Sequence, residues 1–211
     1  MAADPDPNNL DPDTRAAEAE RSVDLLFGTR LIGMPFTHLA QVAHPPPPFV
    51  GGSWNYWWQA HYLDAIVDAG LRRLRSGDHR GALEHVRLGN RLVATVRVRN
   101  VGRFTNRYYD DMAWLALAIE RLRGLTGLVG GLRPPRRLQA ADRALTTRLR
   151  TAMTADLGGG LFWNTTRDFK NVPATGPAAL HLARSGDLEA ARLLVEWVYA
   201  RLLGPDTGLF L

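Results

Sequence analysis

Residues 106–118 read Asn-Arg-Tyr-Tyr-Asp-Asp-Met-Ala-Trp-Leu-Ala-Leu-Ala, a stretch that predicts the beginning of an apolar helix behind two carboxylates. The segments on either side repeat this pattern, with apolar residues at near-helical spacing between Gly- or Pro-bearing breaks. The best strand candidate, 96–101, is short and interrupted by arginine. The sequence therefore predicts an all-α protein. The expected helices cover about 13–28, 54–75, 79–97, 109–123, 136–154, 174–185 and 187–203.

The composition is that of a globular protein with one sizeable core, since 45% of the 211 residues are apolar and 22% are charged. No apolar run approaches the ~20 residues of a membrane span, and the first residues lack the parts of a signal peptide. We therefore expect no membrane partner and a cytoplasmic location. The chain has no cysteine, no histidine pair at metal-ligand spacing and no phosphate loop. Neither a metal nor a cofactor is expected.

The net charge of +5 raises the question of a nucleic-acid partner. The arginines, however, are scattered between acids along the helical stretches instead of forming one dense stripe. We therefore expect no nucleic-acid partner.

The domain organisation follows from local composition. Residues 1–13 are rich in Pro, Asp and Asn and predict a flexible tail, which leaves 14–211 as one helical domain. Within it, the prolines of 45–48 predict a loop, and Ser53 is the expected N-cap of the following helix.

A repeated triplet suggests that the helices form an array of hairpins. Gly160-Leu161-Phe162 recurs as Gly208-Leu209-Phe210, about 48 residues later, each time after a long helix and a Gly-containing turn. That spacing suits one helical hairpin of a solenoid or of a closed toroid. The odd number of helices and the apolar ending 209–211 predict an interrupted architecture.

The adjacent Asp110 and Asp111 have two interpretations. They can cap a helix, because their charges favour its positive end. They can also form a carboxyl pair whose pKa values are pushed apart, so that one donates a proton while the other stays ionised, as glycosidic cleavage requires. The residues alone leave both open.

Aromatic side chains are candidates for sugar binding, because their flat faces stack on the C–H faces of pyranose rings. Core packing is the alternative for each of them. His61, Trp114 and Trp197 are assigned to the core. The candidate substrate contacts are Trp57, Trp58, Tyr109 and Trp163.

The stretch Tyr-Tyr-Asp-Asp-Met-Ala-Trp-Leu-Ala-Leu-Ala of 108–118 resembles the signature of glycoside hydrolase family 76, the bacterial endo-α-1,6-mannanases and related fungal cell-wall enzymes. The likeness extends to 57–65, 158–163 and 170–179, and spans roughly residues 50–211. It implies an (α/α)6 toroid and an α-1,6-linked mannose polymer as substrate. Since it implies six hairpins and the sequence predicts three and a half, we expect an incomplete toroid that lacks its C-terminal part.

The resemblance also implies roles for particular residues. Asp110 would be the nucleophile and Asp111 the general acid and base. Lys170 and Asn171 lie in a loop between a Gly-rich turn and a helix, where polar residues can face a cleft, so they are further candidates for substrate contact; a solvated loop is the alternative. Because the Cα atoms of adjacent residues are about 3.8 Å apart, the pair favours the short carboxyl separation of a retaining enzyme.

Three alternatives remain open at this point. The chain could be a non-catalytic helical-repeat module that binds a glycan or a protein, and its two aspartates would then be exposed caps. It could be another toroid enzyme, such as a sugar epimerase, or an inactive truncated relative. For an incomplete toroid we also expect self-association through an exposed edge.

Overall fold

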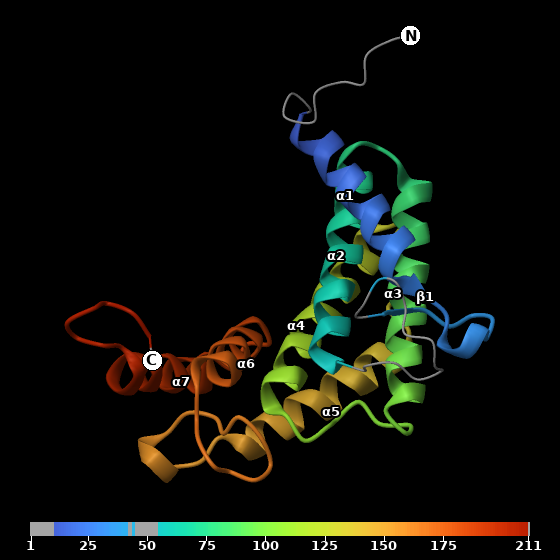
Figure 1. Ribbon diagram of the computed structural model, residues 1–211. Helices are drawn as coiled ribbons and strands as arrows, with labels where there is room; N and C mark the ends of the chain where they lie inside the picture. The colour runs from blue at the N-terminus through green and yellow to red at the C-terminus, as the bar shows by residue number, and fades with distance from the viewer. Residues whose placement is uncertain (1–10, 42–43, 45–54, 211) are drawn as a thin grey trace.

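The computed structural model describes residues 11–41, 44 and 55–210, and these are mostly helical (Figure 1). The predicted all-α class is confirmed. The described helices are α1 (Pro12–Phe27), α2 (Tyr56–Arg75), α3 (His79–Arg99), α4 (Tyr109–Leu128), α5 (Arg136–Ala152), α6 (Val172–Arg184) and α7 (Leu188–Leu202), with the 3-10 turns η2 (Leu31–Gly33) and η3 (Asp156–Gly158). Among them, none is both long and apolar enough to cross a membrane.

Two features differ from the predicted elements. The strand candidate 96–101 is helical up to Arg99, because α3 continues and buries Val96. A pair of very short antiparallel strands, β1 (Gly28–Thr29) and β2 (Leu39–Ala40), was not predicted. The predicted cap Ser53, the proline loop 45–48 and residues 1–10 of the predicted tail lie outside the described residues.

The helices form three consecutive hairpins, α2–α3, α4–α5 and α6–α7. The first helices of these hairpins contact one another in order, so that α4 lies between α2 and α6. Its side chains Met112, Ala116 and Ile119 are fully buried. This is the arrangement of neighbouring hairpins in a toroid, with α2, α4 and α6 in the inner layer.

Two glycines allow the first hairpin to approach α4 closely. A Cβ atom at Gly70 would lie 2.6 Å from a methyl carbon of Leu125, and one at Gly89 would lie 2.8 Å from a methyl carbon of Leu122. Both distances are shorter than any ordinary contact, so a larger residue would force the Leu125 or Leu122 side chain to shift. The two glycines thus leave room for α4 to pack closely on α2 and α3.

The repeated triplet corresponds to a repeated structure. Leu161 forms a β-bridge with Met153, the C-cap residue of α5, and Phe210 forms one with Leu203, the C-cap residue of α7. In both places the chain turns back on the end of the helix that it has just left. The predicted hairpin repeat is therefore visible in the backbone, although the bridging residue shifts by one position within the triplet.

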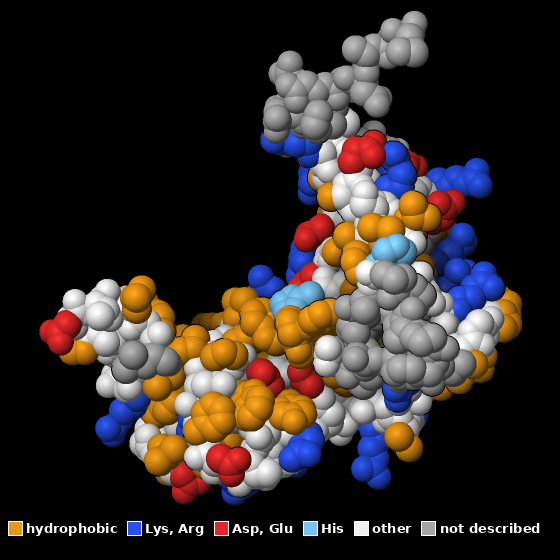
Figure 2. All heavy atoms as spheres, in the orientation of Figure 1, with side chains coloured by type: hydrophobic (Ala, Val, Ile, Leu, Met, Phe, Trp, Pro, Cys, Tyr) orange, Lys and Arg blue, Asp and Glu red, His pale blue; other side chains and the backbone are white. Residues whose placement is uncertain are grey.

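The last hairpin carries many exposed apolar side chains (Figure 2). They include Leu180 (46% exposed), Leu193 (49%), Tyr199 (59%) and Leu209 (68%). Because exposed apolar side chains are unfavourable in water when they gather in patches, we expect the 211-residue protein to self-associate through α6 and α7 as its concentration rises. Sedimentation velocity between micromolar and hundred-micromolar concentrations measures this, and Leu193→Glu/Tyr199→Glu should shift the distribution toward monomer. A concentration-independent monomer would contradict the expectation.

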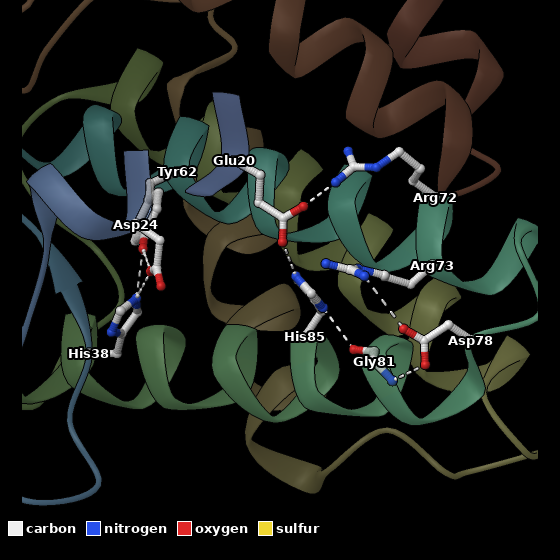
Figure 3. A network of polar contacts seen from close by, with 9 residues as sticks. All are labelled: Glu20, Asp24, His38, Tyr62, Arg72, Arg73, Asp78, Gly81 and His85. Atoms are coloured by element: carbon white, nitrogen blue, oxygen red, sulfur yellow. Dashed lines mark hydrogen bonds and ion pairs between the residues drawn. The ribbon is translucent and has the colours of Figure 1, made fainter. Parts of the chain in front are cut away.

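Helix α1 is attached to the hairpins by polar contacts (Figure 3), and none of its described residues is buried. Glu20 contacts Arg72 of α2 and lies 2.7 Å from Nε2 of His85 on α3. Nδ1 of His85 lies 2.7 Å from the Gly81 carbonyl oxygen, so both ring nitrogens face oxygen atoms. Further along α1, Asp24 accepts a 2.7 Å hydrogen bond from the Tyr62 hydroxyl.

Glu20→Gln should loosen α1 without unfolding the hairpins. The change removes the negative charge that faces Arg72 and His85, and hydrogen bonds to charged groups contribute about 1.5–3 kcal/mol. Amide hydrogen exchange within α1 should therefore accelerate by about tenfold or more, with little change in α4. Glu18→Gln is the matched control, because Glu18 is exposed and pairs with Arg21 on the same helix.

Candidate active site

A cleft with a volume of about 400 Å³ lies at the beginning of α4. It is formed where the first turns of α2 and α4 meet the end of α3 and the loop that follows α5. In Figure 2, acidic side chains over the beginning of α4 are bordered by hydrophobic ones. The cleft is lined by Asn55, Tyr56, Trp57, Asn100, Asn106, Arg107, Tyr108, Asp110, Asp111 and Trp163.

Backbone hydrogen bonds hold the loop after α5 against the first turn of α4. The Tyr109 amide donates to the Trp163 carbonyl oxygen over 2.8 Å, and the Thr165 amide donates to the Arg107 carbonyl oxygen over 2.9 Å. The indole of Trp163 then lies between two other rings, with centroid distances of 5.1 Å to Tyr108 and 5.2 Å to Phe169. Tyr108 and Trp163 of this cluster form one aromatic wall of the cleft.

Asp110 is held by two hydrogen bonds. One carboxylate oxygen accepts from the Asp111 amide over 2.9 Å, and the other accepts from Nε1 of Trp163, also over 2.9 Å. The first contact satisfies a free N–H group of the helix, as the capping interpretation requires. The second does not belong to a cap, because it joins Asp110 to a residue 53 positions away and fixes the carboxylate in the cleft.

Asp111 has a different environment. Only 6% of the residue is exposed, and one carboxylate oxygen accepts a 2.5 Å hydrogen bond from Nδ2 of Asn106. Burial raises the pKa of Asp111 to about 6, and the charge of Asp110 acts in the same direction. The Asn106 and Trp57 N–H donors oppose the rise without cancelling it. The exposed cap expected of a non-catalytic module does not describe this buried carboxyl group.

The predicted aromatic contacts Trp57 and Trp163 both line the cleft. Trp58 does not line it: the residue is 37% exposed, and its ring forms a T-shaped contact with the ring of Trp57 at a centroid distance of 5.4 Å. Tyr109 does not reach the cleft either. It is 2% exposed in the core, with the guanidinium of Arg148 over its ring. The substrate contact predicted for Tyr109 does not fit this position.

Lys170 and Asn171 also have structural positions away from the cleft. Nζ of Lys170, which is 7% exposed, donates to the carbonyl oxygens of Thr154, Asp156 and Gly159 and so holds the turn around η3. Burial lowers the pKa of Lys170 below its ordinary value. Asn171 caps α6 by accepting from the amide of Ala174. The substrate contacts predicted for both residues do not fit these positions.

Of the three residues assigned to the core, the structure buries only one fully. Trp197 is 6% exposed and donates from Nε1 to the Leu157 carbonyl oxygen. Trp114 is partly buried against the core. His61 is exposed, and the assignment to the core is wrong: its ring contacts Trp114 and Trp57 at centroid distances of 4.9 and 5.5 Å.

Sequence reasoning did not assign Asn106 and Tyr108 to the site. Both lie within a few residues of Asp110 and Asp111 in the sequence, and this nearness could have indicated that they belong to the site. Asn100, at the end of α3, had no such signal, because only packing brings that helix end to the cleft. Within the described ranges, no group of three His, Asp or Glu residues is arranged to hold a metal ion.

Comparisons with known proteins bear on this arrangement. No family model matches the chain, and neither does any curated protein sequence. Among solved structures, the GH76A α-1,6-mannanase of Salegentibacter sp. HEL1_6 is similar, with a TM-score of 0.74 and 26% identity over 95% of this chain and 54% of that chain. A variant of that enzyme, inactive with two adjacent aspartates replaced by asparagine, was solved in complex with α-1,6-mannotriose.

A more distant structure shares the fold. The family 76 glycoside hydrolase (mannosidase) Bt3792 of Bacteroides thetaiotaomicron has a TM-score of 0.70 at 16% identity, over 94% of this chain and 56% of that chain. The chain thus spans about half the length of the structures that it matches. Over that half, it has the all-α toroid fold of the glycoside hydrolase family 76 mannanases.

Proposed function

We propose that this protein is a retaining glycoside hydrolase that acts on α-1,6-linked mannose polymers. One observation carries the proposal: two adjacent carboxyl groups line one cleft in unlike environments. Replacement of two adjacent aspartates accompanies inactivity in the similar Salegentibacter enzyme. The substrate class is inferred from that enzyme.

In the first step, the Asp110 carboxylate attacks the anomeric carbon, and the bond from that carbon to the glycosidic oxygen breaks. Asp111 gives its proton to the departing oxygen. In the second step, Asp111 takes a proton from water, and the water oxygen displaces Asp110 from the anomeric carbon. Hydrogen bonds from Trp163 and from the Asp111 amide orient Asp110 for this attack.

The different roles proposed for Asp110 and Asp111 follow from the burial of Asp111. A pKa of about 6 leaves Asp111 partly protonated near neutral pH, so it can serve as the acid and then as the base. Asp110 accepts from two N–H donors, which suits an acceptor-only, ionised carboxylate. The aromatic wall offers flat faces for sugar rings, while Asn100 and Arg107 offer polar groups for their hydroxyls.

Proton NMR during hydrolysis tests the proposal. The protein is incubated with α-1,6-mannan, and the anomeric signals of new reducing ends are followed before mutarotation. We expect the α anomer to appear first, and an α-1,3-linked mannan to be cleaved far more slowly. A first product of β configuration would contradict the retaining mechanism, and equal cleavage of both polymers would contradict the substrate.

A further inference from the structure

A second pocket lies at the other end of α4. Thr126, near the end of that helix, lines it, and 15 residues of helix, or about 22 Å, separate Thr126 from Asp111. Its volume is about 570 Å³, within the range of small-molecule sites. It is lined by Phe36, Leu83, Val86, Arg87, Asn90, Arg91, Ala94, Thr126, Leu132, Arg133, Pro135 and Arg137.

Four arginines and no carboxylate line this pocket. Arg87 and Arg91 are one turn apart on α3, while Arg133 and Arg137 flank the beginning of α5. Other arginines in the described part of the chain pair with acids, as Arg121 does with Asp64, but none of these four takes part in any of the ion pairs found there. The pocket is therefore a concentration of positive charge without an internal counterion.

The beginning of α5 adds to this charge. A helix N-terminus carries a partial positive charge, which an acid in the first turn offsets. Here the first turn has no acid, the cap residue Pro135 supplies no side-chain hydrogen bond, and Arg137 lies in that turn. This arrangement is unfavourable by itself, and a bound anion would relieve it.

A buried amide oxygen provides independent evidence for a ligand. Asn90 lies on α3 between Arg87 and Arg91 and is 7% exposed. Its Nδ2 donates to the Val86 carbonyl oxygen over 2.8 Å, but its Oδ1 has no hydrogen-bond partner. A buried acceptor without a partner is costly. A deprotonated anion oxygen cannot satisfy it, because the amide oxygen needs a donor such as a hydroxyl group.

The rim of the pocket offers an apolar surface. Phe36 is 82% exposed, and Leu132 is 44% exposed. An aromatic face beside polar groups suits the C–H face of a sugar or cyclic polyol. A fitting ligand thus combines an anionic group, hydroxyl donors and a saturated ring.

We propose that this pocket binds the phosphate ester of a sugar or cyclic polyol. The arginines bind the phosphate, since guanidinium groups match its geometry and charge. A ligand hydroxyl donates to Oδ1 of Asn90, and the ring lies against Phe36. Binding here is independent of the proposed hydrolysis, because the pocket and the cleft share no residue.

Calorimetric titration of the 211-residue protein tests this with three probes at constant ionic strength: mannose 6-phosphate, mannose and inorganic phosphate. We expect the phosphate ester to bind at least about tenfold more tightly than either fragment. Arg87→Gln/Arg137→Gln should weaken that binding about tenfold or more. Arg80→Gln/Arg143→Gln removes the same charge from the same two helices outside the pocket and should leave it unchanged.

Asn90→Leu tests the proposed hydroxyl contact separately from phosphate binding by the arginines. It should reduce the affinity for mannose 6-phosphate to that for inorganic phosphate, and leave the latter unchanged. Equal weakening by both arginine pairs, or equal affinity for the ester and for phosphate, would overturn the proposal, as would the absence of ester binding. Asp110→Asn should retain ester binding, which distinguishes this pocket from the cleft.

The phosphate ester could be free or part of a lipid headgroup. Co-sedimentation with phosphatidylcholine vesicles that contain phosphatidylinositol 4-phosphate addresses the source. Vesicle binding that requires Arg87, Arg137 and Asn90 would assign the pocket to a headgroup. Binding of mannose 6-phosphate without vesicle binding would assign it to a free ester.

Discussion

Asp110→Asn should abolish hydrolysis of α-1,6-mannan, with a loss of about 10⁴-fold or more in rate, while α-1,6-mannotriose still binds within about threefold of the original affinity. The asparagine oxygen can still accept from Nε1 of Trp163, so the cleft keeps its shape. An amide cannot form the covalent glycosyl ester, and the first step fails. Reducing-end release measures the rate, and quenching of tryptophan fluorescence measures binding.

Trp163→Phe is the matched variant for this experiment. It keeps an aromatic ring between Tyr108 and Phe169 but removes the N–H donor to Asp110. A hydrogen bond to a charged group contributes about 1.5–3 kcal/mol, so we expect a rate reduced by about 10- to 150-fold. If Asp110→Asn retained wild-type turnover, Asp110 could not be the nucleophile.

The helices could be predicted because local signals agree with the packing. Gly77-Asp78 and Gly186-Asp187 each end one helix and begin the next, with the aspartate as cap of α3 and of α7. The apolar run after Asp111 requires burial on several sides, and α4 lies between two other inner helices. The strands β1 and β2 have two residues each, which is too short for any periodic pattern.

The site could be predicted only in part, because it depends on which way each side chain points, and the spacing of residues in the sequence does not fix this. Tyr108 and Tyr109 are adjacent, yet one lines the cleft and the other enters the core, since the helix begins between them. Lys170 is the only lysine of the chain, and its loop position suggested a cleft contact. The carbonyl groups around η3 bind it instead. The turn creates this arrangement, and the residue pattern of the sequence does not predict it.

Asp111→Asn should make the protein more stable at neutral pH while it removes the general acid. The folded state raises the pKa of Asp111 from 3.8 to about 6, so the folded protein holds this proton more tightly than the unfolded chain. The associated stability is fully present below about pH 4 and is lost as the pH rises through about 6. Since each pKa unit corresponds to about 1.4 kcal/mol, the wild-type protein loses up to about 3 kcal/mol over this range.

Asparagine does not titrate, so the variant escapes this loss and still offers an oxygen to Nδ2 of Asn106. The difference in unfolding free energy between the variant and the wild type should therefore grow in favour of the variant from pH 4 to pH 7. Denaturant titrations at both pH values measure it. Asp206→Asn, which removes an exposed carboxylate, should give the same small difference at both. A variant whose relative stability did not change with pH would show that folding does not raise the pKa of Asp111, and the assignment of Asp111 as general acid would fail with it.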